Sequence, residues 1–221
     1  MSVSKSELPL FPLNTVLFPG MPITLYIFES RYKQMMKACL AGERSFGVVL
    51  IREGTEAFAP LPAPHSVGCT AKIVQVQRLS EGRMNVVAVG RERFRIVDLH
   101  HELPYLTARV VEYPLPLGDP AEVEKRGRRL LPWVAVYLRR LSDFHEMEFE
   151  RSFLPRGALP LAYLAAHLLQ VAARQKQPLL AATDALALLE DLLQLFRREV
   201  ALIHAMLERQ PPEDLGSFSF S

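Results

Sequence analysis

The sequence contains little cysteine, no clear excess of charge of either sign, and no long apolar run. Its two cysteines, Cys39 and Cys69, sit among apolar neighbours, so we expect two buried thiols in a reducing compartment. The formal net charge is only +2, whereas a nucleic-acid-binding domain usually carries a clear basic excess. The most apolar stretch, residues 159–173, includes His167 and is too short and too polar to span a bilayer. The first seven residues lack the apolar core of a signal peptide, which predicts a cytoplasmic protein without a membrane partner.

The sequence also lacks the motifs with which enzymes hold nucleotides or build a nucleophile. Gly42 and Gly47 have the spacing of a phosphate-binding loop, but Val48 and Val49 stand where Lys and Ser or Thr would contact phosphate and magnesium. Neither a G-x-G-x-x-G loop nor a G-x-S-x-G nucleophile elbow occurs. We therefore expect a protein that is not an enzyme, with no catalytic residues and no cofactor.

Histidine and carboxylate clusters are present, but their spacing does not favour a metal site. His100 and His101 are neighbours on a predicted strand, so their side chains would point to opposite faces. Residues 143–150 hold four carboxylates and His145. An oxygen-rich metal site is conceivable there, but a solvated acidic surface is the favoured interpretation. We predict no metal.

Two parts of the chain follow different patterns, which together predict an α+β protein. Residues 1–116 alternate apolar and polar side chains between Gly and Pro turns, which indicates short strands around one helix in a small closed or nearly closed barrel. Residues 117–210 repeat apolar side chains every three or four positions, typical of packed helices. Pro132 should kink or split the first of these helices. Residues 211–221 are predicted to form a flexible tail.

Five segments of the first part, in this order, resemble the N-terminal domain of the Lon protease family. The first, residues 8–32, reads as a strand, a Phe-Pro-Gly turn, a second strand and the start of a helix. We expect Phe18 and Tyr26 of this unit to be buried. The other segments are residues 46–50 (FGVVL), 67–73 (VGCTAKI), 82–96 (GRMNVVAVGRERFRI) and 104–110 (PYLTARV), and in the helical part residues 173–180 (ARQKQPLL).

The resemblance implies an N-terminal PUA-like β-pseudobarrel with one inserted helix, followed by a C-terminal α-helical bundle. It also implies binding of unfolded or exposed apolar polypeptide, or of a protein partner. A complete Lon protease continues into an ATPase and a Ser-Lys protease, neither of which is found in this sequence. The chain therefore looks like the substrate-recognition domain alone, and its oligomeric state stays open.

The candidate partner-binding residues are aromatic side chains expected near the junction of the two parts. A barrel edge offers unpaired amides for strand addition, and a crevice between subdomains is a common ligand site. Bound polypeptide could lie at either place. The candidates are Phe94, Tyr105, Trp133 and Tyr137.

The alternative is a PUA-like RNA-binding protein. Arg91, Arg93 and Arg95 occupy alternate positions, which places three guanidinium groups on one face of a strand, where they could bind phosphate. Phe94 and Ile96 would then face the core. The balanced total charge and the lack of an evident aromatic stacking platform favour polypeptide over nucleic acid.

Overall fold

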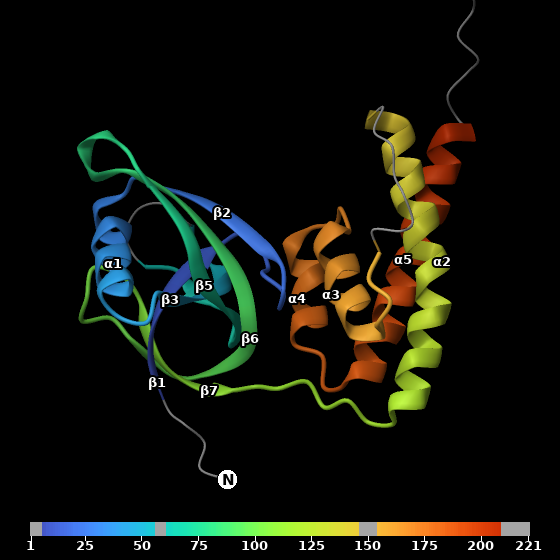
Figure 1. Cartoon of the computed structure of the whole chain (residues 1–221), viewed down its shortest axis with the longest axis horizontal. Helices are drawn as coiled ribbons and strands as arrows, with labels where there is room; N and C mark the ends of the chain where they lie inside the picture. Colours follow the sequence, from blue (N-terminus) through green and yellow to red (C-terminus); the bar gives the residue numbers. More distant parts are fainter. Residues whose placement is uncertain (1–5, 56–60, 146–153, 209–221) are drawn as a thin grey trace, which may run out of the picture.

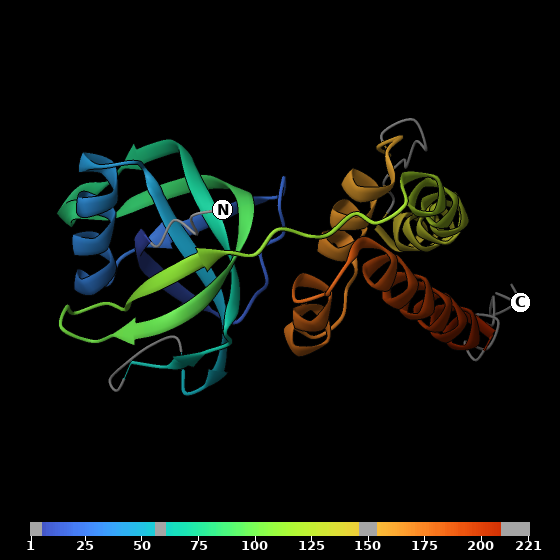
Figure 2. The same cartoon turned by 90° about the horizontal axis from the view of Figure 1, so that it is seen from below.

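The computed structural model describes residues 6–55, 61–145 and 154–208 of the chain. It is a mixed α+β structure in which a barrel-like sheet lies at one end of the long axis and most of the helices lie at the other (Figures 1 and 2). An extended segment after the last strand connects the two halves.

The sheet contains seven strands among the described residues. They are β1 (Ser6–Leu13), β2 (Pro22–Ile27), β3 (Ser45–Glu53), β4 (Ala63–Pro64), β5 (Val67–Arg78), β6 (Met84–His100) and β7 (Thr107–Glu112).

Strand β1 closes the sheet because its two halves pair with different strands. Residues 6–9 pair antiparallel with β7, and residues 10–13 pair in parallel with β3. Strand β3 pairs with β5, β5 with β6, and β6 with β7, all antiparallel. The hydrogen-bonded ring therefore returns to β1, which confirms the predicted closed barrel.

Strand β2 lies outside this ring. It pairs with the first half of β6, where Pro22 is opposite Val89 and Ile27 is opposite Met84. No other described strand pairs with β2, so one of its edges is open.

The turn before β2 has the geometry expected for Phe-Pro-Gly: Gly20 has a φ of +79° and donates its N–H to the Gly90 carbonyl at 2.9 Å. A Cβ on Gly90 would lie 2.2 Å from a backbone oxygen of the turn, so glycine is required for this approach.

The helix that follows β2, α1 (Ser30–Ala41), closes one end of the barrel (Figure 1). Its buried residues lie on one face of the helix, and the ring of Tyr32 stacks on Phe11 of β1 with 4.1 Å between ring centroids. This inward face consists of Tyr32, Met35, Met36 and Cys39.

Four further helices form the second half of the molecule: α2 (Pro120–His145), α3 (Ala158–Leu168), α4 (Ala173–Leu180) and α5 (Ala185–Glu208). The long helices α2 and α5 pack along each other, while α3 and α4 lie between them and the barrel (Figure 1). Asp119 and Asp184 cap helix starts by accepting N–H bonds at 3.0 and 2.9 Å. One helix runs through Pro132, so the predicted alternative of a split helix is wrong.

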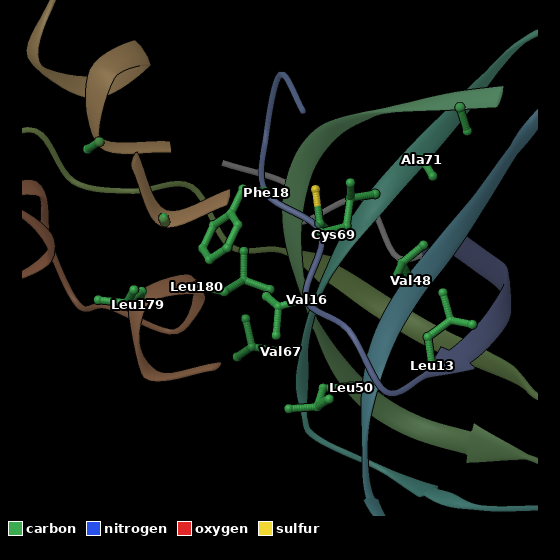
Figure 3. Packing of buried hydrophobic residues seen from close by; sticks show 14 of the residues in the cluster. Leu13, Val16, Phe18, Val48, Leu50, Val67, Cys69, Ala71, Leu179 and Leu180 are labelled. Carbon is green, nitrogen blue, oxygen red and sulfur yellow. The ribbon is translucent and has the colours of Figure 1, made fainter. Parts of the chain in front are cut away.

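The two halves share one hydrophobic core. Leu180 of α4 lies beside Val16, Phe18 and Val67 from the barrel (Figure 3). Phe18 is fully buried, as predicted, and its ring lies 6.4 Å from that of Tyr163 in α3. Because this packing excludes water on both sides, the barrel and the helices are held together and not merely linked.

The two cysteines are buried thiols, as the sequence predicts. Burial raises the pKa of Cys39 to about 11 and that of Cys69 to about 12, so neither is a reactive thiolate at neutral pH. Of the helices in the described ranges, none is long and apolar enough to cross a membrane.

Candidate functional site

The structure does not bring the four candidate aromatic residues together. Phe94 is buried inside the barrel, in a small cluster with Leu106. Tyr105 is buried in the main core, on the segment that leads into β7. Tyr137 packs its ring edge against Phe196 at 5.2 Å within the helical half. These three residues form part of the cores, and their role in partner binding stays an untested prediction.

Trp133 differs from the other three because its ring is only half-buried. It lies on α2, where the guanidinium of Arg197 sits 5.4 Å from the ring centroid. That contact is within the range of a cation–π interaction. Helix α2 lies at the far side of the helical half from the barrel (Figure 1), and the role of Trp133 in partner binding stays a prediction.

The three candidate arginines differ in environment, and a register shift between β5 and β6 interrupts the alternation beside Arg91. Arg91 and Arg95 are exposed, whereas Arg93 is 3% exposed. Arg93 and Arg95 both lie over the ring of Tyr113, at 4.6 and 4.1 Å from its centroid. Their neighbour Phe94 points into the barrel, as the alternation predicts.

Arg93 joins the barrel to the helices. Its Nη1 donates to the carbonyl oxygens of Leu180 and Ala182, both at 2.8 Å, and its Nε donates to the carbonyl of Tyr113 at 3.1 Å. Burial lowers the pKa of Arg93. Nearby, Gln177 donates its side-chain amide to the Val67 carbonyl at 2.9 Å. Arg93 therefore contributes to the fold and is not free to bind phosphate, so the RNA-binding alternative is not supported.

A small crevice does lie between the two halves, as predicted. Its volume is about 260 Å³, and it is bordered by Pro19 of the turn, Glu112 at the end of β7 and Tyr163 of α3. Arg91 and Arg93 also line it. Cationic and anionic groups are mixed on its walls, so the crevice is poorly suited to apolar polypeptide.

A second, apolar groove lies at the open edge of β2. It has a volume of about 160 Å³ and lies where the end of β1, the end of β2 and the start of α1 meet. Its lining is formed by Phe11, Pro12, Leu13, Leu25, Tyr26, Ile27, Phe28, Glu29 and Tyr32. We call this site the β2 groove.

Two aromatic side chains beside the β2 groove face solvent. Tyr26 is 50% exposed and Phe28 is 56% exposed. Their rings stack on each other with 5.7 Å between centroids and 26° between planes. Arg83, from the β5–β6 turn, donates to the Tyr26 hydroxyl at 3.3 Å. Stacked aromatic rings at an unpaired strand edge form a preorganised contact surface for apolar side chains.

The strand period explains why these rings are outside. Leu25 and Ile27 are buried, while Thr24 and Tyr26 between them are exposed. The prediction that Tyr26 is buried was therefore wrong. Ile23, Leu25 and Ile27 occupy alternate positions, so their side chains point to the inward face and Tyr26 points to the opposite face. That pattern was the sequence signal that could have found Tyr26 and Phe28.

Histidines and carboxylates do not assemble into a metal site in the parts of the chain that the structure describes. His100 instead lies 2.9 Å from the carboxylate of Glu7. Of the acidic segment considered above, residues 146–150 lie outside the described residues, as do residues 211–221 of the predicted tail.

Comparison with known proteins places this arrangement in a family. The family profile described as "ATP-dependent protease La (LON) substrate-binding domain" matches residues 7–198. The chain is similar to a Lon protease of Syntrophus aciditrophicus, with 27% identity over 219 residues that cover 94% of this chain and 27% of that protein. It is similar to Lon protease 2 of Myxococcus xanthus, with 29% identity over 197 residues, 87% of this chain and 24% of that protein. The chain thus spans about a quarter of the length of these relatives.

Solved structures agree with this assignment. A Lon N-terminal domain protein from Xanthomonas campestris has a TM-score of 0.62 and 26% identity, over 86% of this chain and 98% of that one. The N-terminal domain of a Mycobacterium avium complex Lon protease shares the fold, with a TM-score of 0.62 and 20% identity over 87% of this chain and 98% of that one. The chain belongs to the family of ATP-dependent protease La (LON) substrate-binding domains.

Proposed function

We propose that this protein binds exposed apolar segments of unfolded polypeptides at the β2 groove, without catalysing a reaction. The observation that carries the proposal is the pair of exposed, stacked rings of Tyr26 and Phe28 beside an apolar groove at an unpaired strand edge. Membership of the substrate-binding family supports the same function.

Strand addition would supply the affinity. The open edge of β2 presents backbone N–H and C=O groups that an extended polypeptide can pair with. Apolar side chains of the bound segment would enter the β2 groove or cover the rings of Tyr26 and Phe28. Because backbone groups are common to all sequences, such a site selects for extended conformation and apolar character and not for one motif.

The remaining parts of the proposal concern the whole chain. We infer two subdomains, a PUA-like barrel over residues 1–116 and a helical bundle over residues 117–210. We further infer a cytoplasmic, non-catalytic protein whose partner is a polypeptide. Among the aromatic candidates, Trp133 is retained as a secondary contact because its ring is partly accessible, whereas Phe94, Tyr105 and Tyr137 would have to leave their cores to bind.

Fluorescence anisotropy tests the proposal. The probe is a labelled α-lactalbumin held unfolded by reduction and carboxymethylation, and the receptor is the full chain. Binding should be saturable, and the double variant Tyr26→Ser/Phe28→Ser should weaken it by about tenfold or more, since buried aromatic contacts dominate such interfaces. Native α-lactalbumin should not compete.

The matched control removes exposed apolar side chains elsewhere on the barrel. Val74 and Val97 are 51% and 45% exposed on β5 and β6, so Val74→Ser/Val97→Ser makes a similar change away from the groove and should bind as the wild type does. Loss of binding in Arg91→Ala, with the groove variant unaffected, would move the site to the crevice and refute the proposal.

A further inference from the structure

We propose that the β2 groove also binds residues 214–221 of a second copy of this chain, so that the protein associates with itself through its own tail. This inference rests on the proposed function of the groove, because it assumes that the groove accepts extended apolar polypeptide. It adds a specific partner for the site.

The amino-acid sequence of this segment matches the groove. Residues 214–221 read DLGSFSFS, so Phe218 and Phe220 are separated by one serine. In an extended segment, side chains two positions apart share one face. Tyr26 on β2 and Phe28, which follows the end of β2, have the same spacing. Aromatic side chains that face each other across paired strands stabilise the pairing.

The same segment can donate a full set of backbone hydrogen bonds. It contains no proline, whereas Pro211 and Pro212 lie just before it. Proline lacks the N–H needed for strand pairing and favours an extended backbone. The sequence thus provides a spacer and then a short stretch able to pair with the β2 edge.

The position of α5 assigns this contact to a second molecule. The described chain stops at Glu208, at the end of α5. Helix α5 belongs to the half of the molecule opposite α1, which borders the β2 groove, along the long axis (Figures 1 and 2). The groove of a neighbouring copy can approach the tail whatever the separation between tail and groove within one chain. If both copies exchange tails, the result is a closed two-fold dimer and not an open chain.

Sedimentation of the full chain tests the inference by complementation. The wild type should show a concentration-dependent species of twice the 25.0 kDa chain mass. Two variants should each remain monomeric: Tyr26→Ser/Phe28→Ser, which alters only the groove, and Phe218→Ser/Phe220→Ser, which alters only the tail. When the two variants are mixed, one intact groove can meet one intact tail, and a species of twice the chain mass should reappear.

Several outcomes would overturn the inference. They are a wild type that stays monomeric at all concentrations, a dimer that survives either double variant, and variants that fail to complement each other. A dimer that persists in Leu202→Ser/Met206→Ser is expected, because these exposed α5 residues lie away from the groove; loss of the dimer there would assign association to α5 instead.

Binding of unfolded α-lactalbumin to the tail variant separates this inference from the proposed function. The variant Phe218→Ser/Phe220→Ser keeps the groove, so it should bind unfolded α-lactalbumin at least as tightly as the wild type. Tight binding without any wild-type dimer would refute the tail inference and leave the proposed function standing. Failure of that variant to bind, with a dimer present in the wild type, would refute the proposed function instead.

Discussion

Two sides of the barrel use similar side chains for opposite purposes. On the side that faces the helices, Phe18 and Arg93 are buried and connect the two halves. At the open edge of β2, Tyr26 on the strand and Phe28 just after its end remain half-exposed. The comparison teaches that an aromatic or cationic residue in this fold has its role set by the element that covers it and not by its type.

Substitution of Phe18 and of Tyr26 should give the largest difference in the free energy of unfolding. Phe18→Ala removes a fully buried ring and should lower the free energy of unfolding by about 3–5 kcal/mol. Tyr26→Ala removes a half-exposed ring and should cost about 1 kcal/mol or less. Urea denaturation of both variants measures the difference. Equal losses would mean that the two sides of the barrel are not distinct.

Substitution of Arg93 and of Arg91 should give the next largest difference in the free energy of unfolding. Arg93→Ala takes the donor away from two buried carbonyl oxygens and one part-buried carbonyl oxygen and should lower the free energy of unfolding by about 3 kcal/mol. Arg91→Ala, on the same strand but exposed, should change it by about 0.5 kcal/mol or less. If Arg93→Ala is as mild as its neighbour, the hydrogen bonds to the helices do not hold the halves together.

Acid should weaken the helical half by a smaller amount. Burial, followed by the nearby charge of Lys176, lowers the pKa of His167 below its ordinary 6.5. The unfolded chain therefore takes up a proton more readily than the folded one, and this residue makes stability fall as the pH drops below 6.5. Thermal melts of His167→Gln should be less sensitive to pH over that range than those of the wild type. An unchanged pH profile would contradict this prediction.

The smallest expected effect is no turnover at all. The chain lacks a phosphate-binding loop and a nucleophile elbow, so neither ATP nor casein should be hydrolysed above background. The measurement is phosphate release and peptide release by the purified chain. Activity that follows the 25.0 kDa species through successive purification steps would show that one of the two halves contains a reactive site.

Much of the fold could be predicted from the sequence because local signals were strong. The alternation over the strands and the apolar repeat every three or four positions in the helical part depend on neighbours within a few positions. The order of five segments then indicated the family, and the closed barrel follows from it. The family assignment and the barrel were both confirmed.

The site could be predicted only in outline. The sequence pointed to a barrel edge or a crevice, and both features exist, but three of the four predicted aromatic residues lie in cores. Whether Phe94 or Tyr26 is buried depends on which neighbours cover each face of a strand, and those neighbours are distant in sequence. Leu106 packs in the same buried cluster as Phe94, whereas the exposed rings of Tyr26 and Phe28 stack on each other. The structural role of Arg93 was missed for the same reason. Its hydrogen-bond partners Leu180 and Ala182 lie almost ninety residues later in the sequence.

Hydrogen–deuterium exchange on the full chain, with and without unfolded α-lactalbumin, tests the central claim most directly. If polypeptide adds to the open edge of β2, the amides of residues 23–28 should exchange more slowly in its presence. The amides around the crevice, at Arg91 and Tyr163, should not change. Protection at the crevice with none in β2, or no protection at either place despite saturating polypeptide, would contradict the account.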